Sequence, residues 1–228
     1  MHLGVVLACN AGALNAGGFL AVGRYTSHMT GIISTAADDL VLGNIIPAIA
    51  AIFMLMAFIG GSACTALAVN FAKRNNMNNI YAPVLLFEAV LLLVFGLVGS
   101  TLQSHAFLTV SFTAMFLCYV MGLQNALITK ISDAVIRTTH VTGLVTDIGI
   151  ELGKLIYWSR YKEFAHEAEV LSNSKKLYLH GILVCAFFAG GIAGAAGFKY
   201  LGFISTLPLA LALLALSLAP QFNPDISK

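Results

Sequence analysis

Two short strings hold the residues best suited to binding a solute. They are His28–Leu40 and His140–Leu152, and both read His-x-Thr-Gly-apolar-apolar-Ser/Thr, followed by a carboxylate five residues on and then Leu. The offset between them is constant at 112 residues. Each string is too polar for a lipid-facing span and too apolar for an ordinary loop, so we expect each to form a short helix that serves function.

The Thr-Gly pairs at the start of these helices predict a site for an anionic or polar solute. A helix N-terminus presents unpaired backbone N–H groups, and its dipole favours negative charge. Thr30 with Gly31, and Thr142 with Gly143, would then hold opposite sides of one solute. The alternative is that both threonines are ordinary N-caps and both glycines allow close helix packing.

Histidines and acids near these strings are candidates for proton coupling. His28 and His140 occupy equivalent positions, and an imidazole changes charge near pH 6.5. Asp147 lies one turn into the second helix, on one face with Glu151, and Lys154 follows to neutralise one of them. The alternatives are loop histidines that bond a neighbouring helix end, and carboxylates that are solvated at the interface.

Glu88 stands inside a long apolar run. An ionised carboxylate in a membrane interior costs roughly 2.5 to 3.5 kcal/mol on insertion scales unless it is paired or exposed to a wet cavity. We therefore predict that Glu88 is protonated, partnered or wet, and that it exchanges a proton during a transport cycle. The structural alternative is a neutral acid that donates a hydrogen bond to a backbone carbonyl.

Three amides also lie in apolar runs, where each needs hydrogen-bond partners. Asn15, Gln124 and Asn125 are predicted to line the solute path, or else to join helices to one another. The four cysteines are far apart and lack the close pairing of a zinc site or a disulfide framework. We therefore expect neither a metal nor a cofactor.

The elements that must position these residues are membrane helices. The 228 residues are 59% hydrophobic and 10% charged, with a mean hydropathy of +0.89, whereas soluble domains carry about 25% charged residues. The net charge of +2 offers no basic surface for nucleic acid. The expected partners are membrane lipid and a small-molecule solute.

Six apolar stretches are long enough to cross a hydrocarbon core of about 30 Å, which takes about 20 helical residues. They are Leu3–Gly23, Ile45–Ala72, Ile80–Leu102, Ala106–Ile128, Leu177–Gly197 and Tyr200–Ala219. We predict an all-α polytopic membrane protein with these six transmembrane helices and two short motif helices, at 29–43 and 141–158, that cross or re-enter the membrane. The polar stretch at about 159–176 is predicted to be a cytoplasmic insert.

The positive residues favour the re-entrant arrangement. If neither motif helix crosses, ten of the twelve Lys and Arg residues fall on one side, and only Arg24 and Lys199 on the other. If both cross, Lys154 falls within a helix and the rest divide five against six. Because positive charge marks the cytoplasmic side, we predict a multi-pass protein of the bacterial inner membrane with both termini cytoplasmic.

The two strings belong to a longer internal repeat. An Asn-Ala pair precedes each string, and a Gly-Gly pair follows each, at 60–61 and 190–191. We predict two halves, 1–104 and 105–228, which are inverted if each has three spans; paired broken helices in such halves are typical of a transporter's central site. The Gly-Gly pairs also offer small-residue faces for helix contact or for a homo-oligomer.

The chain resembles the YoaK-type family of bacterial inner-membrane proteins, a domain family of unknown function. The resemblance is carried by Gly12-Ala-Leu-Asn15-Ala16-Gly-Gly-Phe19, Met29-Thr30-Gly31, Gly122-Leu-Gln124-Asn125-Ala126 and Arg137-Thr138-Thr139-His140-Val-Thr142-Gly143-Leu-Val-Thr-Asp147. Asn15 stands where the family commonly has Asp, and Ile32 where Asn commonly follows Thr-Gly. The resemblance implies a polytopic membrane protein suspected of transport and supplies no substrate.

These features favour a secondary transporter or facilitator of a small polar or anionic solute, coupled to protons through Glu88, Asp147 or the histidines. A structural or accessory membrane protein without transport activity remains an alternative. An intramembrane enzyme is disfavoured, because the sequence has neither a His-Glu-x-x-His nor a Gly-x-Ser-x-Gly motif. We therefore expect no enzymatic activity.

Overall fold

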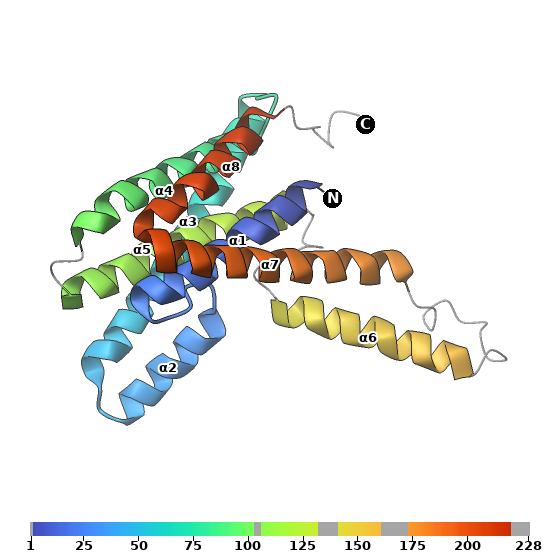
Figure 1. Ribbon diagram of the computed structural model, residues 1–228, viewed down its shortest axis with the longest axis horizontal. Helices are drawn as coiled ribbons and strands as arrows, with labels where there is room; N and C mark the ends of the chain where they lie inside the picture. Colours follow the sequence, from blue (N-terminus) through green and yellow to red (C-terminus); the bar gives the residue numbers. More distant parts are fainter. Residues whose placement is uncertain (1, 103–105, 132–140, 161–172, 220–228) are drawn as a thin grey trace.

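A computed structural model describes residues 2–102, 106–131, 141–160 and 173–219 (Figure 1). All regular structure within these ranges is helical, as predicted. The elements are α1 (His2–Val22), α2 (Met29–Val41), α3 (Ile45–Arg74), α4 (Ala82–Leu102), α5 (Ala106–Ile131), α6 (Val141–Arg160), α7 (Ser174–Leu201), the short 3₁₀ helix η3 (Gly202–Ser205) and α8 (Thr206–Leu218). The predicted boundary between the halves falls between α4 and α5, and most of the predicted insert lies outside the described residues.

Several of these helices suit a membrane. Helical stretches long and apolar enough to cross one are Leu3–Val22, Ile45–Arg74, Ser111–Ile131 and Ser174–Leu218. The last contains 45 residues, more than twice the length of one crossing, and includes both α7 and α8. A shorter apolar helix covers Ala82–Leu97 in α4. Large apolar side chains such as Leu67 and Ile192 are exposed and suit contact with lipid, so the chain is a multi-pass helical membrane protein.

The break between α7 and α8 differs from the prediction. α7 continues to Leu201 instead of ending at Gly197, and α8 begins at Thr206 instead of Tyr200. Gly202 lies at the break with a φ of 63°, which glycine adopts without the steric penalty of a Cβ. The reversal of the chain is therefore set by this glycine and the short 3₁₀ turn that follows it.

Two helix pairs approach so closely that only glycine fits at the contact. Where α1 meets α7, a Cβ on Gly190 would collide with the carbonyl of Cys9. Where α3 meets α5, a Cβ on Gly61 would collide with the carbonyl of Tyr119. These small-residue faces are occupied within the chain, so they give no support to the homo-oligomer predicted through them.

Both of these pairs run parallel, whereas α4 and α8 run antiparallel. One turn beyond the glycine contact in α3, Thr65 donates its hydroxyl to the carbonyl of Leu123, one turn further along α5, at 2.9 Å. In the other pair, Gly194 and Ala13 make the equivalent contact. In contrast, the residues just before α4 meet the end of α8: Asn79 donates its amide to the carbonyl of Ser217 at 3.2 Å.

The two motif helices, α2 and α6, each pack against the first half of a long helix (Figure 1). Ile32 of α2 shares an apolar cluster with Met54 of α3, and Leu144 of α6 shares one with Leu183 of α7. Met54 and Leu183 each lie nine residues after the first residue of their helix, which is about 14 Å of helix. Each motif helix therefore begins near the middle of its partner and runs back toward the partner's start.

Candidate functional site

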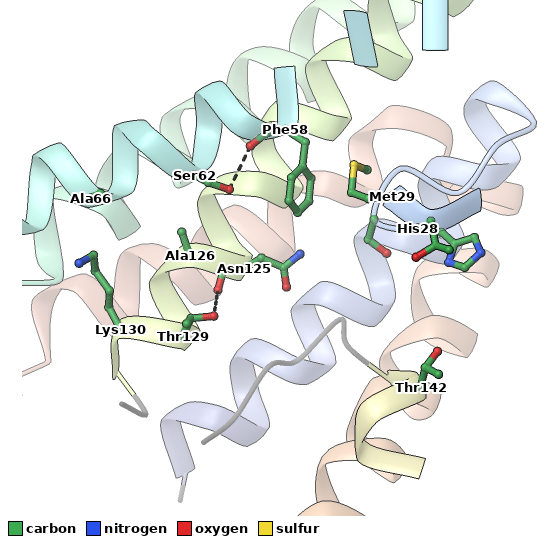
Figure 2. A pocket seen from close by; sticks show the side chains of 12 residues that line it. His28, Met29, Phe58, Ser62, Ala66, Asn125, Ala126, Thr129, Lys130 and Thr142 are labelled. Carbon is green, nitrogen blue, oxygen red and sulfur yellow. Dashed lines mark hydrogen bonds between the residues drawn. The ribbon is translucent and has the colours of Figure 1, made fainter. Parts of the chain in front are cut away.

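A cavity of about 720 Å³ lies between the first turns of the two motif helices (Figure 2). Its lining comes from the loop before α2 and from α2, α3, α5 and α6: Ser27, His28, Met29, Thr30, Phe58, Ser62, Ala66, Asn125, Ala126, Thr129, Lys130 and Thr142. The structure thus brings Thr30 and Thr142 to one cavity, although 112 residues separate them in sequence.

The first motif reaches the cavity through His28 and Thr30. The imidazole of His28 is exposed and does not cap α2. It lies against Gly31, where a Cβ would collide with the ring. Gly31 therefore acts by leaving room for His28, and it is not part of the cavity lining.

The second motif reaches the cavity through Thr142 at the start of α6. Gly143 follows it without lining the cavity, and Leu144 fastens this first turn to α7 through its apolar cluster. His140, the predicted counterpart of His28, lies outside the described residues.

The three predicted amides occupy different places. Asn125 lines the cavity. Asn15 does not, but its side-chain oxygen accepts the hydroxyl of Ser27 at 2.8 Å and the backbone N–H of the same residue at 3.4 Å, which positions the loop before α2. Gln124 is fully buried away from the cavity, and its amide has no hydrogen-bond partner among the described residues.

Four lining residues were missed by the sequence reasoning: Ser27, Ser62, Thr129 and Lys130. Lys130 is exposed near the end of α5 and gives the cavity a positive charge. Thr129 could have been found, because it follows Asn125 by four residues and so shares its helix face. Lys130 was considered only as a marker of membrane orientation.

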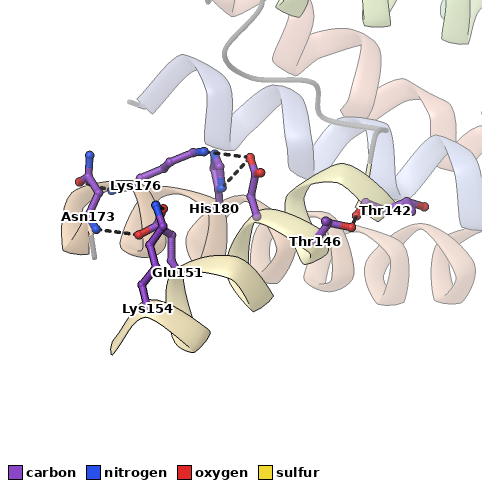
Figure 3. Close-up of polar contacts among 8 residues, drawn as sticks. Thr142, Thr146, Glu151, Lys154, Asn173, Lys176 and His180 are labelled. Atoms are coloured by element: carbon purple, nitrogen blue, oxygen red, sulfur yellow. Dashed lines mark hydrogen bonds and ion pairs between the residues drawn. The ribbon is translucent and has the colours of Figure 1, made fainter. Parts of the chain in front are cut away.

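Asp147 lies on the face of α6 that meets α7, and it does not line the cavity (Figure 3). Its carboxylate is 3.3 Å from the ammonium of Lys176 and 3.6 Å from Nδ1 of His180. The side chain of Asp147 is 38% exposed, whereas that of His180 is almost fully buried. The predicted proton-coupling acid is thus part of an ion-pair contact between two helices.

Glu151 makes a second polar contact between α6 and α7 (Figure 3). Its carboxylate accepts the backbone N–H of Asn173 at 2.7 Å and lies 3.4 Å from the ammonium of Lys154. The hydrogen bond from Asn173, with the charges of Lys154 and Lys176, holds the pKa of the Glu151 carboxyl below its ordinary value against the opposing effect of desolvation. Glu151 is therefore charged at neutral pH and joins α6 to the start of α7.

Glu88 lies in α4, away from the cavity, and its side chain is fully buried. Leu85, Ala89 and Leu92 on the same face are buried in the main apolar cluster. Neither carboxyl oxygen of Glu88 has a hydrogen-bond partner in the part of the chain that the structure describes. The predicted hydrogen bond to a backbone carbonyl is thus not present there.

Comparison with known proteins gives a family without an assigned activity. A family model described as "Protein of unknown function (DUF1275)" matches residues 3–219. The chain is also 25% identical over 183 residues to the "UPF0700 transmembrane protein YoaK" of Bacillus subtilis (strain 168), which covers 79% of this chain and 80% of that protein. No solved structure matches the chain.

Proposed function

The chain belongs to the DUF1275 family of proteins of unknown function, and on this premise we propose that it is a secondary transporter or facilitator of a small polar or anionic solute. The observation that carries the proposal is the shared cavity, in which Thr30 and Thr142 come from the two motif helices. A pair of broken helices that meet at the centre of a membrane protein is typical of transporter sites. The proposal assigns no enzymatic step to the chain.

The pattern of burial supports two repeated halves. Five buried positions of α3 recur in α7 at a constant offset of 129 residues: Ala51, Met54, Gly61, Thr65 and Val69 correspond to His180, Leu183, Gly190, Gly194 and Phe198. This register is one residue from the Gly-Gly match in the sequence. The contacts of α1 with α7 correspond to those of α5 with α3, as an exchange of the halves requires.

The direction of the last helix in each half supports an inverted arrangement. α4 and α8 occupy equivalent places in the two halves, and they run antiparallel. We therefore propose six spans, with α2 and α6 re-entering from opposite faces. α2 has 13 residues, about 20 Å of helix, which is too short for a full crossing. The distribution of Lys and Arg then places both termini in the cytoplasm of a bacterium.

The depth of the motif helices supports a site near the membrane midplane. Ile32 and Leu144 each pack at a level about 14 Å from the start of their partner helix, which is about half of a 30 Å hydrocarbon core. Thr30 and Thr142 lie in the first turns of these helices, where backbone N–H groups are unpaired. The site would thus be reachable from either face as the halves move.

Flux through proteoliposomes tests the proposal. We expect the purified protein to accelerate the exchange of at least one solute in a panel of glycerol, urea, lactate, glycerate and nitrate. Thr30→Val and Thr142→Val should each slow that exchange about fivefold to tenfold, as expected for the loss of one hydrogen bond. Thr146→Val is the matched control, since its hydroxyl bonds the carbonyl of Thr142 on the same helix without lining the cavity.

Two results would contradict transport. Exchange equal to that of protein-free vesicles for every solute in the panel would favour the structural or accessory alternative. Equal losses in Thr142→Val and Thr146→Val would indicate that the substitutions act on the stability of α6 and that the cavity is not the path.

A further inference from the structure

The hydroxyl groups on the cavity wall use their own hydrogens within the protein. Ser62 donates to two backbone carbonyls, in α3 at 3.0 Å and in α5 at 3.1 Å. Thr129 donates to the carbonyl of Asn125 at 2.7 Å. Ser27 donates to the side-chain oxygen of Asn15, which also accepts a backbone N–H and is thereby fixed as an acceptor.

These three hydroxyls can therefore only accept hydrogen bonds from a solute. A hydroxyl has one hydrogen and two lone pairs, and in each case the hydrogen is already engaged. A solute that offered only acceptors would leave these lone pairs unmatched and would lose water that had satisfied them. The wall thus favours a solute that carries its own O–H donors.

The charge of the cavity supplies a second requirement. Lys130 lines it, and no carboxylate is among the lining residues that the structure describes. An ammonium group is a compact point charge with three donors, and it attracts one anionic group. A solute with one negative charge matches this lining, whereas a cation is repelled.

We propose that the cavity binds a small hydroxycarboxylate, with its carboxylate at Lys130 and its hydroxyls donating to Ser27, Ser62 and Thr129. This proposal rests on the proposed transport function and names the class of solute. A cavity of about 720 Å³ falls within the usual size of small-molecule sites.

Three solutes of three carbons separate the two requirements. Glycerate carries both the charge and the hydroxyls, propionate carries only the charge, and glycerol carries only the hydroxyls. A ligand that binds the native state raises the temperature of unfolding. At matched ionic strength, we expect glycerate to stabilise the full-length protein in detergent at concentrations at least tenfold lower than propionate or glycerol.

Variants then test the assigned contacts. Lys130→Gln should raise the apparent Kd for glycerate at least tenfold and should leave the weak binding of glycerol unchanged. Thr129→Val keeps the shape and removes the acceptor, so it should raise the Kd for glycerate about fivefold and leave that for propionate unchanged. Thr146→Val should change neither value, because this residue makes the same kind of backbone contact outside the cavity.

Each outcome separates this proposal from the transport function. Equal binding of propionate and glycerate, equal binding of glycerol and glycerate, or no binding of any of the three would overturn the hydroxycarboxylate assignment. Counterflow of labelled glycerate in proteoliposomes is measured separately. Binding without counterflow would support the assigned solute class and contradict transport, whereas flux of another solute without glycerate binding would leave transport standing and remove this class.

Discussion

Glu88 is a carboxylic acid buried where its environment offers it little. Its oxygens have no hydrogen-bond partner among the described residues, and the equivalent position in the second half is Leu213, which is also fully buried. A carboxylate in that place would need a partner or water, so a neutral acid is expected in the resting protein. An apolar residue would satisfy the packing equally well, which makes the retention of an acid a sign of function.

Two substitutions of Glu88 separate packing from proton coupling. Glu88→Leu copies the second half and removes an unpartnered polar group, so it should unfold at the same temperature as the parent protein or a few degrees higher. Glu88→Gln keeps the size and removes titration, so it should fold normally but lose any pH dependence of solute accumulation. Thermal unfolding in detergent and uptake at several pH values provide the measurements. Unchanged pH-dependent accumulation in Glu88→Gln would exclude proton coupling at this residue.

At the scale of single residues, the sequence predicted part of the site. The repeated string predicted Thr30, Thr142 and His28, and the geometry places all three at one cavity. Asp147 could not be assigned from sequence, because its partners Lys176 and His180 belong to another helix and were brought to it only by folding. A lone carboxylate near a motif is the same sequence signal whether it faces a cavity or a lysine.

At the scale of elements, the contact of α6 with α7 should depend on pH. Because the pKa of Glu151 is lowered in the folded protein, its contribution to stability is fully present above the ordinary value of about 4.3 and is lost as the pH falls through the lowered value. Glu151→Gln should therefore unfold at a lower temperature than the parent at pH 7. The difference should vanish below about pH 4.

Thermal unfolding of both proteins across this pH range checks the expectation, if native-state aggregation is absent at the acidic end. Asp38→Asn is a suitable control, because Asp38 is an exposed acid on the other motif helix. A difference between Glu151→Gln and the parent that persisted undiminished at pH 3 would show that the charge of Glu151 is not what holds the contact.

The close helix pairs give a prediction about glycine. Gly190→Ala places a methyl group against the carbonyl of Cys9 and should separate α1 from α7, with a loss of about 1 to 3 kcal/mol in the free energy of unfolding. Gly61→Ala should cost a similar amount at the contact of α3 with α5. Gly149→Ala, in α6 with open space around it, should instead be neutral or stabilise by up to about 1 kcal/mol.

Chemical unfolding in mild detergent measures these three variants under one condition. If Gly190→Ala proved as stable as Gly149→Ala, the proposed close approach of α1 and α7 would be wrong.

The helices themselves were mostly predictable, since long apolar stretches and polar strings differ clearly in composition. Both motif helices begin at the predicted residues, Met29 and Val141. The boundary between α7 and α8 was not predictable, because the sequence there is apolar on both sides and contains glycines at both 197 and 202. Hydropathy measures length in such a run and does not locate a turn.

At the scale of the whole molecule, the inverted arrangement predicts which loops share a face of the membrane. In a background lacking the native cysteines, Arg74→Cys and Lys175→Cys should be protected from a membrane-impermeant thiol reagent in intact cells. Arg24→Cys and Lys199→Cys, on the opposite face, should react. All four residues are exposed, so protection reports the side of the membrane and not burial. Reactivity at position 74 with protection at 175 would restore eight spans and parallel halves.

The contacts of the two motif helices with their partners are not equal, and this has a consequence for the resting state. α6 is joined to α7 by the ion pair of Asp147 with Lys176 and by the bond of Glu151 to Asn173. The corresponding polar contact of α2 in the described chain is local and exposed, from Asn44 to Asp39. Two halves of identical sequence would give inward-open and outward-open states of equal energy. The extra contacts on the α6 side remove this degeneracy, so the empty protein should populate one of the two states in excess, and solute would meet it preferentially from one side.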